Sequence, residues 1–190
     1  MSMLATFHGL RPFGGYDLIM ADPPWHYEMR TEAGEAKSPQ AYYQTMSIDA
    51  IKALPVEALA GRNCLLWLWA VGPMLPQALD VMAAWGFEFK TQGEWAKMTK
   101  NGKQAFGTGY ILRSAGEPFL IGTRGAPRTT KSVRSVILAP VREHSRKPEK
   151  AFAEAEKLMP DAKRLELFSR QQRAGWDVWG NETRKFEAVA

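Results

Sequence analysis

Ten consecutive residues, Tyr-Asp-Leu-Ile-Met-Ala-Asp-Pro-Pro-Trp at positions 16–25, decide how the rest of the chain is interpreted. The first six form a short apolar run rich in strand-forming residues. Pro23 and Pro24 stop this run abruptly, because proline has no backbone N–H with which to continue a strand ladder. The pattern predicts a buried strand over residues 16–21, with the carboxylate of Asp22 directly beyond its carboxyl end.

Outward from this strand, apolar runs alternate with helix-start residues along the whole chain. Helices are predicted to begin near Ser47, Pro73 and Pro148, and Pro55 is expected to bend or split the first of them. Further strands are predicted at residues 64–70, 87–98, 118–123, 133–139 and 164–168. This alternation indicates an α/β domain with a mainly parallel sheet. Ligands bind beyond the carboxyl ends of the strands in such sheets, so the ends of 16–21 and 164–168 are candidate site positions.

The composition is that of one folded domain. Apolar residues make up 45% and charged residues 24% of the 190, which excludes a disordered or collagen-like chain. We find no repeat or linker and expect a single domain over residues 1–190. The single cysteine, Cys64, cannot form an internal disulfide and is interpreted as a buried apolar residue. The longest apolar run is too short for a bilayer and the N-terminus lacks signal-peptide features, so a cytoplasmic protein with no membrane partner is expected.

Positive charge is concentrated in two segments. Residues 124–150 carry eight basic and two acidic side chains, whereas the rest of the chain is nearly neutral. A second basic run, Lys97, Lys100 and Lys103, has no acid between residues 95 and 112. Clustered Lys and Arg favour a polyanion such as nucleic acid, because they release the counterions of its phosphates. A solvated basic face is the alternative.

The residues after the first strand suit the activation of an exocyclic amine. The carboxylate of Asp22 and the carbonyl of Pro23 can both accept hydrogen bonds from such a nitrogen, which draws its lone pair out of conjugation. Pro23 and Pro24 restrict the backbone, so that a carbonyl can point into a site. Trp25 offers a flat face on which a base can stack. The structural alternative is a proline turn with Asp22 as a helix cap and Trp25 in the core.

The Asp-Pro-Pro-Trp motif after a buried strand resembles the signature of S-adenosylmethionine-dependent adenine-N6 methyltransferases. The chain is similar to the branch that contains the catalytic subunit of the mRNA adenosine methyltransferase and small bacterial and phage DNA adenine methyltransferases. The resemblance extends from Tyr16 to Glu182. Further matching motifs, in the same order, are YQTMS at 43–47, Trp95 with Lys97, EPFLIG at 117–122, SRKP at 145–148, ELFSR at 166–170 and GWDVWGNE at 175–182.

This resemblance implies a Rossmann-like methyltransferase fold in permuted order, with helices on both faces of the sheet and the catalytic motif before the cofactor-binding segments. It also implies S-adenosylmethionine as the cofactor. The implied catalytic residues are Asp22, Pro23, Pro24 and Trp25. The implied cofactor-binding residues are Asp22, Lys147, Arg170, Asn181 and Glu182. The implied substrate-binding residues are Trp25, Tyr43, Lys97 and Glu117.

Each of these roles has a structural alternative. Lys147 could be one more exposed basic residue, and Glu182 a solvated tail residue. Tyr43 could pack in the core, and Glu117 could be an acid at a strand start. Glu166 matches a family glutamate that could orient Arg170, although a structural salt bridge would explain it equally well.

The chain also departs from the family pattern. Residues 3–6 (MLAT) lack the acidic or polar side chain that often contacts the cofactor adenine. Gln172 stands where eukaryotic members have a cofactor-contacting histidine. The histidines at positions 8, 26 and 144 have no metal-ligand spacing among themselves or with Cys64, so no metal is expected.

Three hypotheses follow for the function. The favoured one is an enzyme that methylates N6 of adenine in DNA, with either site-specific or relaxed specificity. The second has the same chemistry with an RNA acceptor. The third is a catalytically silent nucleic-acid-binding subunit of a methyltransferase complex. Because 190 residues leave little room for a target-recognition region, relaxed specificity or a second protomer or partner subunit is expected.

Overall fold

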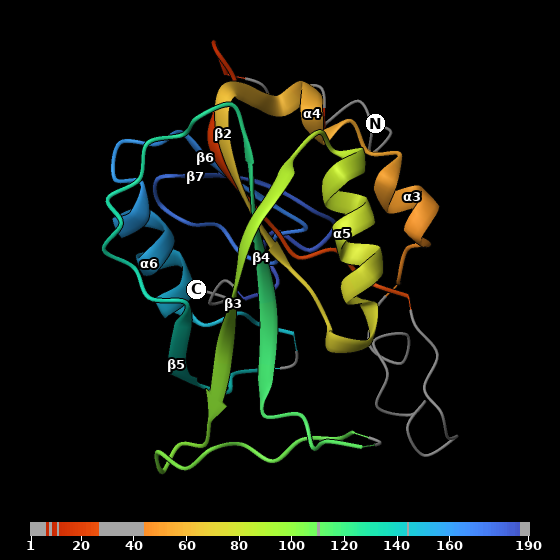
Figure 1. Ribbon diagram of the computed structural model, residues 1–190, viewed down its shortest axis with the longest axis vertical. Coiled ribbons are helices and arrows are strands. Elements are labelled where there is room, and N and C mark those ends of the chain that lie inside the picture. Colours follow the sequence, from red (N-terminus) through yellow and green to blue (C-terminus); the bar gives the residue numbers. More distant parts are fainter. Residues whose placement is uncertain are drawn as a thin grey trace.

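The computed structural model describes residues 7, 9–10, 12–26, 44–109, 111–143 and 145–186. Within these ranges it contains a seven-stranded sheet with the strand order β5-β3-β4-β2-β1-β6-β7 (Figure 1). The strands are β1 (Tyr16–Ala21), β2 (Ala60–Trp69), β3 (Glu88–Met98), β4 (Gly116–Arg124), β5 (Val136–Pro140), β6 (Arg164–Leu167) and β7 (Trp176–Trp179).

The sheet is mainly parallel, as the sequence predicted. The central strand β1 pairs in parallel with β2 and β6, and the β3–β5 and β6–β7 pairs are parallel too. Only β4 runs the other way, antiparallel to β2 and to β3, because it returns directly from β3 without a crossover helix. β7 was not predicted as a strand. Its four residues are too few to show a clear alternating pattern in sequence.

Helices cover both faces of the sheet, which confirms the predicted architecture (Figure 1). α3 (Ile48–Lys52) begins after Ser47, whose hydroxyl accepts a hydrogen bond from the amide of Ala50 at 3.2 Å. Pro55 separates it from the short helix α4 (Val56–Leu59), as expected for a proline that splits a helix. Pro73 lies in a 3-10 turn (Gly72–Met74), and α5 (Leu75–Ala84) follows with Pro76 in its first turn. α6 (Glu149–Leu158) begins directly after Pro148.

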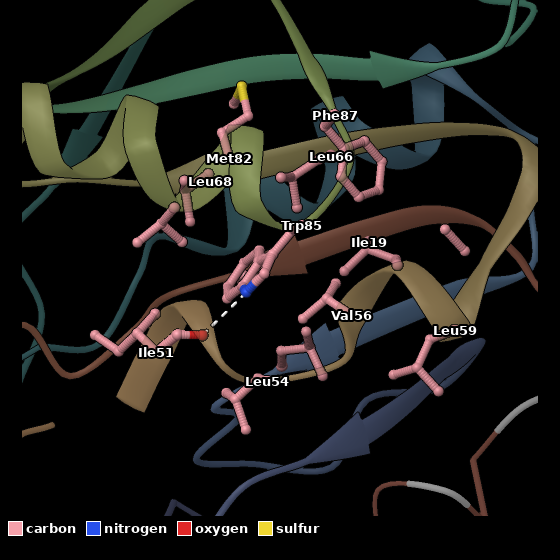
Figure 2. Close-up of a cluster of buried hydrophobic side chains, with 14 of the residues drawn as sticks. Ile19, Ile51, Leu54, Val56, Leu59, Leu66, Leu68, Met82, Trp85 and Phe87 are labelled. Atoms are coloured by element: carbon pink, nitrogen blue, oxygen red, sulfur yellow. Dashed lines mark hydrogen bonds between the residues drawn. The ribbon is translucent and has the colours of Figure 1, made fainter. Parts of the chain in front are cut away.

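The apolar core has one cluster on each side of the sheet. On the side of α3 and α5, Trp85 packs among residues of β1, β2 and α4, and its indole N–H donates to the carbonyl of Ile51 at 3.0 Å (Figure 2). The opposite cluster joins Phe152 of α6 to strand residues that include Trp67 and Trp95. Cys64 is fully buried and unpaired, as the sequence indicated.

The two ends of the sheet differ in their chemistry. At the carboxyl ends of β1 and β6, the amide of Asp22 donates to the carbonyl of Leu167 at 3.4 Å, which brings the two predicted site segments together. A larger, shallow hollow of about 470 Å³ lies at the other end, near the start of β2. Its charged lining consists of Lys52 and the ion pair between Glu57 and Arg124. No described helix is long and apolar enough to cross a bilayer.

Candidate active site

Backbone hydrogen bonds hold the turn after β1 in place. The amide of Trp25 donates to the carbonyl of Pro23 at 2.8 Å, and the amide of Met46 donates to the carbonyl of Pro24 at 2.9 Å. These bonds fix the direction in which Asp22 leaves the strand. A carbonyl oxygen has two lone pairs, so Pro23 keeps acceptor capacity beyond the bond to Trp25.

The indole ring of Trp25 does not offer the open face that stacking on a base requires. Its side chain is buried, with 3% exposure, in the core cluster on the side of α3 and α5. Its N–H donates to the carbonyl of Trp69 at 3.2 Å. The structure therefore corrects the predicted stacking role and supports the alternative of a core residue, which anchors the turn that carries Asp22.

A chain of alternating charges extends from Asp22 into the sheet. The ammonium group of Lys147 lies 2.7 Å from Oδ2 of Asp22 and 2.6 Å from Oε1 of Glu117. Glu117 in turn contacts Lys97, with 2.8 Å between Oε2 and Nζ. The chain Asp22–Lys147–Glu117–Lys97 is neutral as a whole and links β1, the β5–α6 loop, β4 and β3. Lys147 also lies over the ring of Trp69 at 5.3 Å, so it is not simply a solvated basic residue.

Burial and mutual attraction together set the charges in this chain. Burial acts to raise the pKa of Glu117, but the ammonium groups of Lys147 and Lys97 outweigh it and hold this pKa at about 2. Burial acts to lower the pKa of Lys147, but Asp22 and Glu117 outweigh it and hold the pKa above its ordinary value. The pKa of Asp22 is raised by burial and by the charge of Glu117, with Lys147 opposing the rise. Lys147 therefore stays charged between two carboxyl groups.

Beside Asp22 lies a narrow pocket of about 30 Å³. Arg146 and Arg170 both contact Phe186, with guanidinium carbons 4.7 and 5.1 Å from the centre of its ring. The charged lining includes four basic and two acidic side chains, so positive charge dominates. The lining residues are Asp22, Ser145, Arg146, Lys147, Phe152, Glu166, Phe168, Arg170, Gln171, Arg173 and Phe186.

Two pocket-lining residues have a left-handed backbone although neither is glycine. The φ angles are 61° at Ser145 and 62° at Phe168. Such angles are costly for residues with a Cβ atom, and they concentrate at functional sites where the surroundings enforce them. Both residues lie at the points where the chain turns into the pocket, one before Lys147 and one directly after β6.

The predicted cofactor residues after β6 lie in different surroundings. Nε of Arg170 contacts Oε2 of Glu182 at 2.8 Å, which brings two of the predicted residues together. Glu182 is half-buried and not a solvated tail residue, whereas Asn181 is exposed. Within the described residues, neither of these two belongs to the pocket lining.

Glu166 is held by a local hydrogen bond, and its predicted orientation of Arg170 stays a prediction. Its Oε2 atom accepts a hydrogen bond from the hydroxyl of Ser169 at 2.8 Å, and Ser169 is itself 1% exposed. Burial raises the pKa of Glu166 to about 7, despite the opposing effects of Ser169 and Arg173. A partly buried carboxyl group with a raised pKa therefore lines the pocket beside Asp22.

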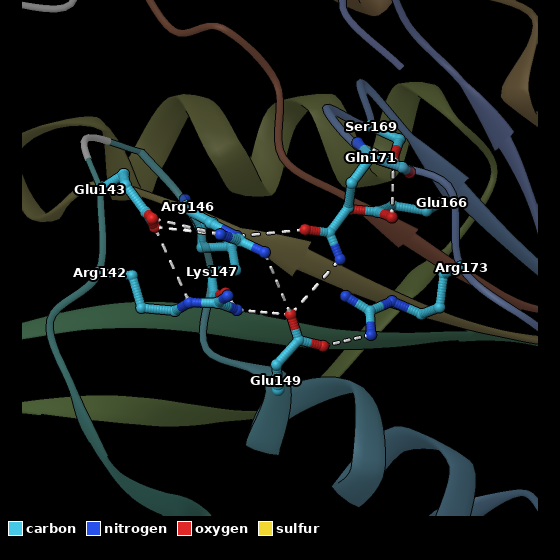
Figure 3. A network of polar contacts seen from close by, with 9 residues as sticks. All are labelled: Arg142, Glu143, Arg146, Lys147, Glu149, Glu166, Ser169, Gln171 and Arg173. Carbon is cyan, nitrogen blue, oxygen red and sulfur yellow. Dashed lines mark hydrogen bonds and ion pairs between the residues drawn. The ribbon is translucent and has the colours of Figure 1, made fainter. Parts of the chain in front are cut away.

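A carboxylate at the start of α6 joins the two loops that form the pocket (Figure 3). Glu149 pairs with Arg142 and Arg173, and the side-chain amide of Gln171 donates to its carboxylate at 3.4 Å. Arg146 approaches the same carboxylate at 3.9 Å and donates to Gln171 at 3.2 Å. Glu149 thus connects the β5–α6 loop to the β6–β7 loop.

The structure brings together Asp22, Lys147, Glu117 and Lys97 of the predicted site. Tyr43 lies outside the described residues. Sequence reasoning missed Arg146 and Phe186 as pocket-lining residues. Arg146 adjoins Lys147 in the SRKP motif, which was the available indication, whereas Phe186 lies beyond the last matching motif.

Much of the basic segment 124–150 is engaged in ion pairs within the protein. Arg142 and Arg146 pair with Glu149, and Lys147 pairs with Asp22. The side chains of Arg128, Lys131 and Arg134 are partly or fully exposed. Among the described residues, no group of three or more His, Cys, Asp or Glu side chains could hold a metal ion.

Comparison with known proteins adds independent findings. The MT-A70 family model matches residues 16–182. The chain is 32% identical over 174 residues to the N(6)-adenosine-methyltransferase MT-A70-like protein of Arabidopsis thaliana, covering 89% of this chain and 24% of that protein. It is 30% identical over 186 residues to the type II methyltransferase M.MunI of a Mycoplasma species, covering 88% of this chain and 77% of that protein.

A third relative is named as an RNA methyltransferase. The chain is 30% identical over 179 residues to the N6-methyladenosine RNA methyltransferase MTA1 of Cryphonectria parasitica, covering 90% of this chain and 53% of that protein. The chain thus spans about a quarter of the length of the Arabidopsis relative and about half of that of the fungal relative. It spans most of M.MunI.

Proposed function

The chain belongs to the MT-A70 family, and we propose that it transfers a methyl group from S-adenosylmethionine to N6 of adenine in nucleic acid. One observation carries this proposal. Asp22 of the Asp-Pro-Pro-Trp turn lies at the carboxyl end of β1 in a charged pocket, ion-paired with Lys147. The names of the relatives, which include N6-adenosine and RNA methyltransferases, support the same chemistry.

The donor set of the pocket fits this cofactor. When bound, S-adenosylmethionine supplies an electrophilic methyl group on a sulfonium that departs as a neutral thioether. The cationic groups of Lys147, Arg146 and Arg170 in the pocket suit its carboxylate. The carboxylate of Glu182, which lies outside the pocket lining and contacts Arg170, suits ribose hydroxyls. Pockets for ligands of this size usually have volumes of about 300–1,000 Å³. The space beside Asp22 is smaller than this, so we propose that the segments around Arg146 and Phe186 separate when the cofactor binds.

The protein's own contribution to transfer is orientation and activation of the amine. The Asp22 carboxylate and the Pro23 carbonyl accept hydrogen bonds from the two N6 protons, so the nitrogen lone pair turns away from the ring and towards the methyl group. Lys147 opposes the rise that burial causes in the pKa of Asp22, and it holds the carboxyl group in place. As the N–C bond forms, the attacking nitrogen becomes positively charged, and the nearby Asp22 stabilises this charge before the proton is released.

DNA is the polymer that we favour, because the sequence resembles small DNA adenine methyltransferases of bacteria and phages. RNA is the second candidate, supported by the name of the fungal relative. In either polymer the target adenine has to be unpaired or flipped to reach Asp22. Exposed basic residues such as Lys100, Lys103 and Arg134 would contact the phosphates, and Glu117, Lys97 and Tyr43 remain candidates on the acceptor side.

A silent binding subunit is the remaining alternative. Such a subunit would transfer no methyl group. Its binding of nucleic acid would require neither Asp22 nor the cofactor. The intact chain from Asp22 through Lys147 to Glu117 favours an active enzyme, because a subunit that only binds nucleic acid has no use for a buried ion chain beside a pocket.

The test is transfer of labelled methyl from S-adenosylmethionine to unmethylated duplex DNA, single-stranded DNA and RNA. Nucleoside digestion then locates the label. Asp22→Asn keeps the shape of the side chain and removes its charge, and Asp80→Asn on the exposed face of α5 is the matched control. We expect label on adenine N6, a rate lowered about 100-fold or more by Asp22→Asn, and no effect of the control.

The other outcomes separate the alternatives. Transfer to RNA alone would replace DNA by RNA as the substrate. Cofactor binding without transfer to any polymer would indicate that a partner subunit is required. Absence of both transfer and cofactor binding in the wild-type protein would refute the proposed function and favour the silent subunit.

A further inference from the structure

The connection between β3 and β4, residues 99–115, forms a folded arm that projects beyond the end of the sheet (Figure 1). At its base, the amide of Ala105 donates to the carbonyl of Lys97 at 2.8 Å. Near its tip, the amide of Gly107 donates to the carbonyl of Ser114 at 2.8 Å. The amide of Ser114 donates to the carbonyl of Thr108 at 2.9 Å. The β3–β4 arm is therefore an ordered hairpin and not an open loop.

Apolar side chains are exposed near the tip of this arm. The exposed fractions are 84% for Ile111, 82% for Leu112 and 79% for Phe106. Single exposed apolar residues are common on protein surfaces, but a group of large ones on one projection indicates an interaction site.

Close backbone packing supports the tip. A Cβ atom at Gly109 would lie 1.9 Å from the carbonyl oxygen of Leu112, and one at Gly107 would lie 2.5 Å from that of Ser114. Only glycine permits these approaches. The tip is therefore built to hold Ile111 and Leu112 outward in a compact turn.

The arm is also purely basic. It contains Lys100, Lys103 and Arg113 and no acidic residue. The guanidinium carbon of Arg113 lies 5.0 Å from the centre of the Phe106 ring, so a cation and an aromatic face are presented together. Aromatic and apolar side chains interleaved with cations are typical of surfaces that bind unstacked bases and their phosphates.

The base of the arm is connected to the site. Lys97, at the end of β3, contacts Glu117, at the start of β4, and Glu117 contacts Lys147, which contacts Asp22. The two strands that carry the arm thus hold the ion chain that leads to Asp22. A ligand that reaches both the tip and Asp22 must be extended and polyanionic, which describes a nucleic acid.

We propose that the β3–β4 arm is a nucleic-acid wedge. Phe106, Ile111 and Leu112 pack against bases next to the adenine that leaves the stack, while Lys100, Lys103 and Arg113 contact the flanking phosphates. The inference rests on the proposed function for the identity of the target base. The three cations and the absence of acids favour nucleic acid over a protein partner, because most protein surfaces would not complement such a charge.

The test compares two binding probes that need no methyl transfer. One is a short, fully paired DNA duplex, and the other is the same duplex with one unpaired adenine. The variants are Ile111→Ser with Leu112→Ser, and separately Phe106→Ala. Phe13→Ser is the matched control, because Phe13 is fully exposed just before β1, away from the arm. Lys100→Gln with Lys103→Gln tests the phosphate contacts.

We expect the wild-type protein to bind the unpaired-adenine probe about tenfold more tightly than the paired one. Both apolar variants should lose most of this preference, with the dissociation constant for cofactor changed less than about twofold. The double lysine variant should weaken binding of both probes equally and reduce its salt dependence. Thermal melting of each variant, compared with wild type, verifies that the fold is intact.

Two outcomes would overturn the wedge. Apolar variants that bind both probes as the Phe13→Ser control does would show that the tip does not contact bases. Normal probe binding with a smaller assembly in light scattering would assign the tip to a protein interface. A wild-type protein that binds the probes but neither transfers a methyl group nor binds the cofactor would instead refute the proposed activity, and the wedge would then be judged by probe binding alone.

Discussion

The ammonium group of Lys147 lies 2.7 Å from Oδ2 of Asp22, at the point where β1 ends and the Asp-Pro-Pro-Trp turn begins. The same group lies 2.6 Å from Glu117, so one cation bridges two carboxyl groups, one directly after β1 and one in β4. Because the side chain of Lys147 is only 9% exposed, this arrangement holds the site together before any ligand binds. Its loss should therefore affect both stability and the proposed transfer.

Lys147→Met is expected to destabilise the protein by about 3–5 kcal/mol, because it leaves two poorly exposed carboxyl groups without their cation. Transfer should fall about 100-fold or more, since Asp22 loses the charge that keeps it ionised. Urea unfolding and labelled-methyl transfer measure the two effects. Lys157→Met, on the exposed face of α6, is the control.

The pH dependence of this variant gives a separate check. In the wild type the pKa of Glu117 is held at about 2, below its ordinary 4.5, so its contribution to stability is present above pH 4.5 and is lost as the pH falls towards 2. Without Lys147 the pKa of Glu117 should rise and this acid-labile contribution should become smaller, because only Lys97 then lowers this pKa. If the stability of the two proteins changed in parallel between these pH values, Lys147 would not be what lowers the pKa of Glu117.

Glu166→Gln is expected to remove a different pH dependence. Burial raises the pKa of Glu166 from 4.5 to about 7, so ionisation disfavours the folded state. The wild type should lose up to about 3 kcal/mol of stability as the pH rises from 4.5 to 7, with no further loss above that. Glutamine can still accept the hydrogen bond from Ser169, so the variant should not show this loss.

Urea unfolding at several pH values between these limits measures the difference. Glu88→Gln is the matched control, because the side chain of Glu88 is 77% exposed and lies far along β3 from the pocket. If wild type and Glu166→Gln lost stability in parallel over this range, the buried carboxyl would not be the cause.

Local sequence was sufficient for the elements whose ends are marked by their own residues. β1 ends where two prolines follow, and α3 begins after the side-chain cap of Ser47. β7 was missed because its pairing partner β6, and not its own four residues, makes it a strand. The antiparallel direction of β4 depends likewise on which strand it lies beside.

The members of the ion chain could be named from the sequence, but their contacts could not. The motifs identified Asp22, Glu117 and Lys147 separately, whereas only the fold shows that one ammonium group joins them. The direction of the Trp25 ring could not be read from a tetrapeptide, because it depends on which side of the sheet the turn packs against. Phe186 reaches the pocket through a fold of the chain beyond the last strand.

Trp25→Phe distinguishes a core anchor from a base-stacking residue. It removes the indole N–H that bonds the carbonyl of Trp69, which should cost about 1–3 kcal/mol of stability. If the ring is an anchor, the KM for nucleic acid should stay within about twofold of wild type at a temperature where the variant is folded. Trp85→Phe is the matched control, since Trp85 is also buried and its N–H bonds the carbonyl of Ile51. A large rise in KM for Trp25→Phe alone would restore the stacking role.

Glu149→Ala should weaken cofactor binding although Glu149 does not line the pocket. Its carboxylate ties Arg142 of the β5–α6 loop to Arg173 of the β6–β7 loop, and these loops carry Lys147 and Arg170. Without it, three guanidinium groups repel one another and the loops lose their common anchor. We expect the dissociation constant for the cofactor to rise about 3- to 10-fold, with little change in the rate at saturating cofactor.

Glu143→Ala is the matched control for this prediction. Glu143 contacts Arg142 and Arg146 and lies in the same loop as they do, so its removal takes away a carboxylate without separating the two loops. Isothermal titration with S-adenosylmethionine compares the two variants. Equal weakening in both would mean that loss of negative charge near the pocket, and not the link between the loops, sets the affinity. Weakening confined to Glu149→Ala would identify the bridge across the pocket mouth as the feature that prepares Lys147 and Arg170 for the ligand.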